Sequence, residues 1–492
     1  MTRMTPVAAL SSLALAIALL AACSSDPRPP VTDPLPLNAA NINLIFVASE
    51  DLAYSAAGDM NPNTANLTDR GLQRSLLTAS FLQRWVLGTE NVNGIYALEP
   101  MTHLQTSNNY PDMVPLESIE QFAVLNQITL SSDLVGGTPY AGQNYPINAS
   151  YAPGAAPSGV AVPQPFCPTC QGIDFNDTNG DNESLANGII TAGVPGFYVF
   201  SAPWETTSGL MANLNRLQGY NLTLPSHYES ANYIYAISIA PSGGARLLTY
   251  NSNANPASSY PALPAGGLVN SACAPLAPAS INVTVGVGGA VLPQGINTDE
   301  AFYLVRHAEA HPQGYWSDNN YVGAGQWRAL DLPTALSGKI SPDQVWSTDP
   351  AQFSIGTVSA STGDEYWSAV APPMTVAPYA IANQLPYELL ASINGGAANA
   401  PQSIASFFFT GGAFSNHKVL LGMTFQGIPP IVNALLASYY PNGGAPTAPT
   451  WSASNYDSVW ILTLDGSGNL TADFSQCEGI ASAKLPAAPP EF

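Results

Sequence analysis

The fold is decided by the stretch A-F-Y-L-V-R-H-A-E, residues 301–309. Four apolar or aromatic residues, Phe302 to Val305, predict a short buried strand, and Arg306 and His307 follow it directly. In an open α/β sheet, side chains that leave the carboxyl ends of the strands face the crevice where ligands bind. An arginine can hold an anion there, and a histidine can attack it as a nucleophile. The alternative is a strand that ends by chance in two polar residues.

An internal repeat extends this pattern over the chain. Five blocks recur in the same order: 44–51 match 302–309, 71–76 match 325–330, 95–100 match 345–350, 119–127 match 376–384, and 198–200 match 419–421. The last two blocks lie further apart in the first copy, which predicts extra residues within 139–190. Matching order over five blocks predicts that the chain is a duplication.

The repeated blocks predict an α/β fold. Apolar runs bounded by polar residues indicate buried strands, and 66–73 offers Thr68 or Asn66 as the N-cap of an amphipathic helix. Strands that alternate with helices indicate mainly parallel sheets covered on both faces, here as two tandem three-layer α/β/α domains. We expect a signal peptide at 1–22 and a Pro-rich tether at 23–40. A first domain at 41–265, with its insert at 139–190, is joined by a linker at 266–279 to a second domain at 280–475 and a tail at 476–492.

Residues 304–308, L-V-R-H-A, resemble the L-V-R-H-G/A signature of the histidine phosphatase (phosphoglycerate mutase-like) superfamily. The helix start at 67–73 and the run P-M-T-H-L-Q-T at 100–106 are also similar to that family. The resemblance covers about 40–265 and 278–475. It implies that His307 is transiently phosphorylated while Arg306 holds the phosphoryl oxygens, aided by a second arginine and a second histidine. We expect no cofactor and no metal.

The pocket that this resemblance implies is incomplete in the second copy. Nothing basic lies near 349–353, where the second arginine belongs, and Phe425 stands where the second histidine belongs. Glu309 and Asp349 are the nearest candidates for an acid, although both could instead be solvated loop residues. We expect neither Arg306 nor His307 to belong to the core, so that alanine variants should fold.

The first copy has lost more of the pocket. Ala48 and Ser49 replace the Arg–His pair, Trp204 matches Phe425, and only His103 lies near the position of the second arginine. Ser49 as a nucleophile would need a histidine base and an oxyanion hole, and neither is visible. Two functions follow for the whole chain. The first is a phosphomonoester hydrolase that works through a phosphohistidine at His307. The alternative is an inactive pseudophosphatase that binds a ligand or partner in the cell envelope.

The N-terminus predicts export and lipidation. Arg3 precedes an apolar run from Val7 to Leu20, and L-A-A-C at 20–23 resembles a bacterial lipobox with Cys23 as the acylated residue. The alternatives are an ordinary cleaved signal peptide or a buried cysteine. We expect the protein in the bacterial cell envelope, anchored in the lipid bilayer, on the outer membrane facing the periplasm or the cell surface.

Charge limits the partners further. Lys and Arg number 12 against 33 Asp and Glu, a formal net charge of −21. This balance argues against nucleic acid and against docking on anionic lipid. It also repels a small phosphorylated substrate, so any phosphate site must act against the field of the whole chain.

The remaining cysteines fit an exported protein. Four cysteines, an even number, predict the disulfides Cys167–Cys170 and Cys273–Cys477. A redox role for the C-x-x-C pair is the alternative, but no thioredoxin-like βαβ pattern surrounds it, and zinc would need further ligands nearby. The acidic run 174–183 resembles a calcium loop without the required spacing, so a solvated turn is favoured.

Overall fold

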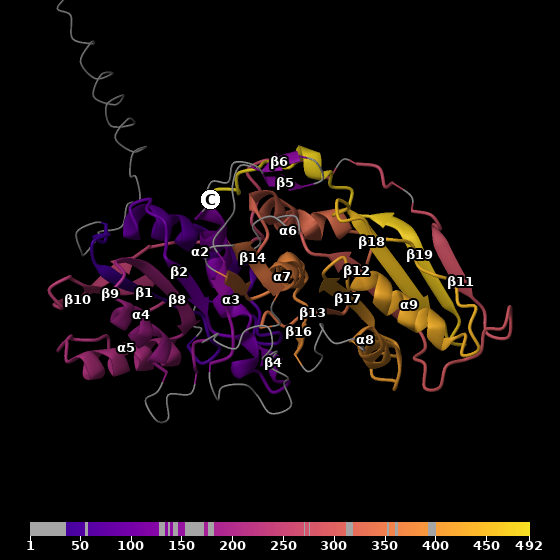
Figure 1. Cartoon of the computed structure of the whole chain (residues 1–492), viewed down its shortest axis with the longest axis horizontal. Coiled ribbons are helices and arrows are strands. Elements are labelled where there is room, and N and C mark those ends of the chain that lie inside the picture. Colours follow the sequence, from indigo (N-terminus) through magenta and orange to yellow (C-terminus); the bar gives the residue numbers. More distant parts are fainter. Residues whose placement is uncertain are drawn as a thin grey trace, which may run out of the picture.

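The computed structural model describes residues 36–54, 58–126, 133–135, 138–140, 146–152, 172–175, 182–269, 271–274, 276–310, 318–351, 354–359, 363–391 and 400–492. Within these ranges the chain forms two large sheets with helices on both faces (Figure 1). The strands at the centre of each sheet are parallel, which confirms the predicted α/β class. None of the helices described is long and apolar enough to cross a membrane.

The first sheet lies in the first half of the chain, residues 41–265. Its strand order is β10-β9-β1-β8-β2-β7, with β1, β8, β2 and β7 parallel and β9 and β10 joined antiparallel. The strands are β1 (Ile42–Ser49), β2 (Gly94–Ala97), β7 (Ile147–Asn148), β8 (Gly196–Pro203), β9 (Tyr233–Ile239) and β10 (Ala245–Asn251).

The second sheet lies in the second half, residues 280–475, and ends two residues beyond it. Its order is β11-β19-β18-β12-β17-β13-β16. The strands β12, β17, β13 and β16 are parallel to one another. The strands are β11 (Ser280–Val283), β12 (Glu300–Arg306), β13 (Gln344–Thr348), β16 (Tyr387–Leu390), β17 (Lys418–Met423), β18 (Ser458–Leu464) and β19 (Leu470–Cys477). Small two-stranded sheets pair β3 (Leu104–Gln105) with β4 (Tyr110–Pro111), β5 (Asp133–Val135) with β6 (Thr138–Tyr140), and β14 (Ser354–Ser359) with β15 (Gly363–Trp367).

Apart from β11, the two sheets share one strand order, and they share its register. Leu44 lies opposite Tyr198 in the first sheet, and Phe302 lies opposite Val419 in the second. Likewise Ile95 lies opposite Val199, and Val345 lies opposite Leu420. These are the residues that the sequence repeat pairs. Val47 and Val305 therefore occupy equivalent places, while origin by duplication stays a prediction.

Strand periodicity explains the layers. Alternate residues of β1 face opposite sides, with Ile45 and Val47 in one core cluster and Leu44 and Phe46 in another. The inner cluster draws on both halves and packs around α2 (Asp69–Phe81), α3 (Val114–Leu125), α6 (Gly323–Leu336) and α7 (Ala371–Asn383). These helices occupy the middle of Figure 1, between the sheets. The outer faces carry α4 (Ser184–Ala192) and α5 (Trp204–Gln218) on the first sheet, and α8 (Ala400–Phe409) and α9 (Ile428–Ser438) on the second.

The helices that follow the first strand of each half share a glycine as their third residue, Gly71 in α2 and Gly325 in α6. Thr68 caps α2 as predicted, and its hydroxyl accepts from the backbone N–H of Gly71 at 3.2 Å. A Cβ at Gly71 would lie 2.1 Å from the Asp59 carbonyl oxygen, and one at Gly325 would lie 2.6 Å from that of Glu309. Both glycines thus let a helix start closely approach the loop after the first strand. Short helical turns complete the fold at η1 (Leu82–Val86), η2 (Pro100–Thr102) and η3 (Ser482–Lys484).

The predicted insert 139–190 corresponds to two longer connections instead of one. Two elements within 139–190, β7 and α4, occupy the places that β16 and α8 hold in the second half, and the bounds of the insert stay a prediction. The longer connections are 126–146, against 384–386, and 149–183, against 391–399. Matching apolar blocks alone could not divide the extra residues, because β7 has only two residues and lacks an apolar run.

The C-terminal tail lies across both halves. The Pro490 carbonyl accepts from the Gln121 side chain at 2.7 Å, and the Ala488 carbonyl accepts from the Trp327 indole at 2.8 Å. A disulfide joins Cys273 to Cys477, which confirms the predicted pairing. It fixes the segment that enters the second half to the end of β19.

Candidate functional site

The second half places Arg306 and His307 at the carboxyl end of β12. Arg306 is the last residue of the strand, and the His307 backbone N–H donates to the Met423 carbonyl at 2.9 Å. This bond keeps the chain beside the end of β17, which is the edge where a doubly wound sheet carries its ligands.

The ring of His307 has a defined tautomer. Its Nδ1–H donates to the Ala308 carbonyl at 2.8 Å, so Nε2 carries the lone pair and lies 3.5 Å from Nη2 of Arg306. Desolvation of the ring, together with the charge of Arg306, lowers the pKa of His307 to about 3. A partly exposed, neutral imidazole results, which is the form that a histidine nucleophile needs.

One amine of the Arg306 guanidinium, Nη1, is bound by the protein, whereas Nε has no hydrogen-bond partner among the described residues. Nη1 donates to the carbonyls of Ser452, Ala453 and Asn455 at 3.4, 2.8 and 3.3 Å. The residue is only 2% exposed, so the expectation that it lies outside the core is wrong. Loop 452–455 closes over it, and this loop carried no recognisable signal in the sequence.

Two aromatic rings flank the same guanidinium. Its carbon lies 3.7 Å from the ring centre of Tyr456 and 4.5 Å from that of Phe425. Desolvation lowers the pKa of Arg306 to about 10, which leaves the group charged at neutral pH. Phe425, at the position expected for a second histidine, therefore packs on the cation, where a histidine would offer an N–H.

The two candidate acids are buried and already paired. Glu309 accepts from Nε of Arg328 at 2.8 Å and from its Nη2 at 2.6 Å, and from the Ser482 hydroxyl at 2.7 Å. Asp349 accepts from the Tyr151 hydroxyl at 2.7 Å and from the Ala351 N–H at 2.8 Å. Both side chains are almost inaccessible, so the alternative of solvated loop residues is wrong as well.

Asp349 also meets its counterpart from the first half. Glu99 and Asp349 precede a proline at equivalent positions of the repeat, and the two buried carboxyl groups lie close enough to interact electrostatically. Burial, with the charge of Asp349, raises the pKa of Glu99 well above its usual range. Carboxyl groups thus stand at the two sequence positions beside which the resemblance led us to expect a second arginine.

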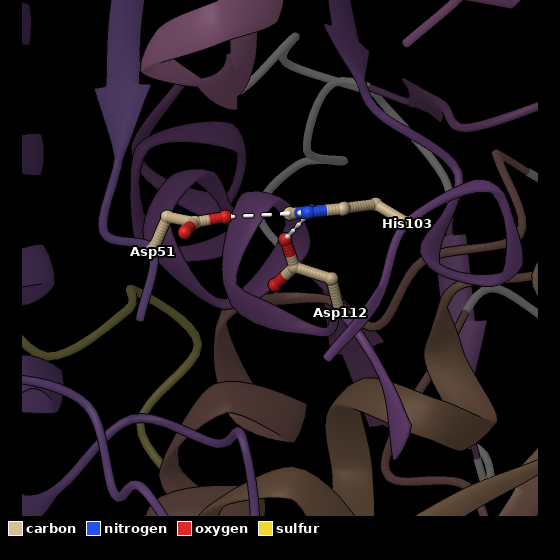
Figure 2. A group of neighbouring side chains, drawn as sticks. All are labelled: Asp51, His103 and Asp112. Carbon is tan, nitrogen blue, oxygen red and sulfur yellow. Dashed lines mark hydrogen bonds and ion pairs between the residues drawn. The ribbon is translucent and has the colours of Figure 1, made fainter. Parts of the chain in front are cut away.

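The first half fills its equivalent pocket differently. Ser49 is buried, and its hydroxyl finds no hydrogen-bond partner among the described residues. Trp204 begins α5 and packs against Tyr228 and Tyr235, with ring centres 6.1 and 5.7 Å away. The partners of His103 are carboxylates and not the Ser49 hydroxyl. Its Nδ1 lies 2.8 Å from Asp112 and its Nε2 lies 3.4 Å from Asp51 (Figure 2).

Asp51 and Asp112 were not predicted as site residues. Asp51 follows the end of β1, so the rule that ligands bind at carboxyl strand ends could have marked it. Asp112 lies nine residues after His103, beyond a small hairpin, and no sequence signal connects the two. Of the other predicted site residues, Cys23, Cys167 and Cys170 lie outside the described residues.

Comparison with models of known protein families finds no match, and neither does comparison with curated protein sequences. Solved structures do align with this chain. They include the protein histidine phosphatase SixA complexed with tungstate, at 18% identity over 36% of this chain and 97% of the other, with a TM-score of 0.22. A mycobacterial glucosyl-3-phosphoglycerate phosphatase aligns at 13% identity over 36% and 98%, with a TM-score of 0.21. A mutant phosphoserine phosphatase from Entamoeba histolytica in complex with phosphoserine aligns at 11% over 36% and 96%, with a TM-score of 0.20.

Proposed function

We propose that this chain is a histidine phosphatase-like protein of the bacterial cell envelope. It acts by binding a ligand or an envelope partner, and not by efficient phosphoryl transfer. The observation that carries the proposal is the state of Arg306. Its Nη1 serves three backbone carbonyls, and two rings flank its guanidinium plane. A phosphate clamp needs these N–H groups directed at phosphate oxygens.

Electrostatics around the pocket supports the same proposal. Asp349 and Glu99 are carboxyl groups near the places expected for a second cation, and Phe425 offers no donor. Removing one such stabilising group typically costs about 10²–10³ in rate. The net charge of −21 adds a general repulsion of phosphate esters.

A second candidate function rests on His307. Its Nε2 lone pair, which faces Nη2 of Arg306 at 3.5 Å, would attack the phosphorus of a phosphomonoester; the P–O bond breaks and the alcohol takes up a proton from water. Water would then cleave the P–N bond of the phosphohistidine and release phosphate. This reading supports a phosphomonoester hydrolase for small phosphorylated substrates.

Phosphate release decides between the two. We expect wild type, His307→Ala and Phe425→His to release phosphate from a panel of phosphomonoesters at the same background rate. Melting temperatures of the three proteins control for folding. A rate that is lost in His307→Ala would overturn the binding proposal in favour of the hydrolase, and a gain in Phe425→His would identify the missing donor.

The envelope location belongs to the same proposal. It rests on the lipobox-like residues 20–23, with Cys23 as the anchored residue and the lipid bilayer as partner. Incorporation of labelled fatty acid, compared between wild type and Cys23→Ser, tests it.

A further inference from the structure

Three side chains of the first half converge at the carboxyl edge of its sheet. Asp51 follows β1, His103 follows the turn η2 after β2, and Asp112 follows β4. A ligand atom from each lies within 4.8 Å of the others. Figure 2 shows the His103 ring reaching the carboxylates of Asp51 and Asp112.

Asp112 fixes the orientation of the imidazole. Its carboxylate is fully buried and lies 2.8 Å from Nδ1, while its other oxygen accepts from the Val114 N–H at 3.1 Å. The ring of Phe175 stacks on the imidazole, with centres 4.3 Å apart and planes at 16°. With Nδ1–H donating to Asp112, the Nε2 lone pair points away from it. A carboxylate that holds the far nitrogen of a histidine is the usual support of a metal-binding imidazole.

Asp51 presents an oxygen to that lone pair. Its Oδ1 accepts from the Ala53 N–H at 2.7 Å, whereas Oδ2 has no hydrogen-bond partner in the described part of the chain. Asp51 is 3% exposed, and Oδ2 lies 3.4 Å from Nε2 of His103. Two electron-rich atoms at this separation need a proton or a cation between them. A spacing of about 3.3–3.5 Å also joins neighbouring ligands of a tetrahedral ion bound at about 2.0–2.1 Å.

The surroundings are negative. Carboxylates of Asp112 and Asp51 lie 2.8 and 3.4 Å from the ring nitrogens of His103, and the charge of Glu205 also acts on the ring. The charges acting on the ring are therefore carboxylates. The same field that opposes a phosphate favours a cation.

We propose that His103 Nε2 and Asp51 Oδ2 bind a divalent transition-metal ion, with Asp112 as the positioning residue behind the imidazole. An imidazole nitrogen beside carboxylate oxygen suits zinc or manganese better than magnesium or calcium, which prefer oxygen alone. This inference rests on the proposed function in naming a ligand for a protein that acts by binding. Its residues, however, are different from those of the Arg306 pocket.

Titration of the full chain tests the site. After chelator treatment, Zn²⁺ and Mn²⁺ are added in calorimetry, and bound metal is counted by mass spectrometry. We expect one ion per chain with a rise in melting temperature. Asp51→Asn and His103→Gln should weaken binding at least tenfold, and Asp112→Asn should weaken it about 10–100-fold.

The matched control is His227→Gln. His227 and Glu229 form another histidine–carboxylate pair, 3.1 Å apart, but on the exposed surface. We expect this variant to bind metal like wild type. Wild type that binds no ion at 100-fold molar excess, or equal binding in Asp51→Asn and His227→Gln, would show that His103 is only an ion-paired imidazolium. Such a result would not change the outcome expected of the phosphate-release assay. Conversely, a phosphatase rate that is lost in His307→Ala would not change the metal binding expected at His103.

Discussion

At the scale of single residues, Arg306 was predicted to bind phosphate but has a structural role in this fold. In a phosphate pocket its guanidinium would face the ligand. Here it links the end of β12 to a loop 146 residues further on. A charge that is almost fully buried is stable only when paired or hydrogen-bonded, and loop 452–455 supplies the acceptors.

Arg306→Ala should therefore destabilise the protein instead of only lowering an activity. The variant leaves carbonyl oxygens without donors and a gap between Phe425 and Tyr456, which we expect to cost about 2–4 kcal/mol. Chemical denaturation measures this difference. The control Arg246→Ala, at an exposed position, should stay within about 0.5 kcal/mol of wild type. Equal midpoints for the two variants would show that the buried cation is dispensable.

At the scale of elements, the start of α6 depends on a missing side chain. Gly325 lies against the backbone of Glu309 and the Cβ of Tyr321, and a Cβ added there would come within 2.6 Å of each. Backbone atoms cannot yield as a flexible side-chain end does, so the helix or the loop after β12 would have to move. That loop carries His307 and Glu309, and the position of α6 thus sets the geometry of the pocket.

Gly325→Ala should lower stability even though alanine favours a helix over glycine by about 1 kcal/mol. The matched control is Gly188→Ala in α4, where a Cβ would meet nothing within 4 Å. There we expect no loss and a gain of up to about 1 kcal/mol. Thermal melts of both variants provide the comparison. If the two substitutions shift the melting temperature alike, close packing at the start of α6 is not limiting.

At the scale of the whole molecule, ionisable groups are buried where the halves meet. Glu120 on α3 accepts from the Asn320 side chain at 3.1 Å, and Glu117 accepts from the Leu67 N–H at 3.2 Å. Burial raises the pKa of both carboxyl groups to about 8 from an ordinary value of 4.5. The folded state therefore keeps protons that the unfolded chain releases above about pH 4.5.

Stability should accordingly fall as the pH rises from about 5 to 8, by up to about 1.4 kcal/mol per pH unit for each such group. Glu120→Gln replaces one of these carboxyl groups with an amide that does not titrate. The free energy of unfolding of this variant, relative to that of wild type, should therefore rise steadily between pH 5 and 8.5. Urea denaturation at several pH values measures the difference in the free energy of unfolding between the variant and wild type. The exposed Glu90→Gln serves as control. A gap between Glu120→Gln and wild type that is constant with pH would mean that Glu120 is ionised in the folded protein.

The local pattern of apolar and polar residues determined much of this fold. Runs such as 44–47 and 302–305 predicted the central strands, and the repeated blocks predicted the shared register, because a strand covered on both faces is apolar at most of its positions. Thr68 as a helix cap is a local effect as well. The Cys273–Cys477 bond followed from the even number of cysteines and from their places outside the recognised elements.

Only the tertiary structure decided what the polar residues do. The sequence marked Arg306 and His307 but could not show that loop 452–455 takes the guanidinium, since that contact depends on how a distant segment packs. Asp51, His103 and Asp112 come together because the ends of β1, β2 and β4 meet at one edge of the first half. The meeting of Glu99 and Asp349 likewise needs both halves in place. A polar side chain takes its role from the atoms within a few ångströms of it, and packing between distant segments brings those atoms there.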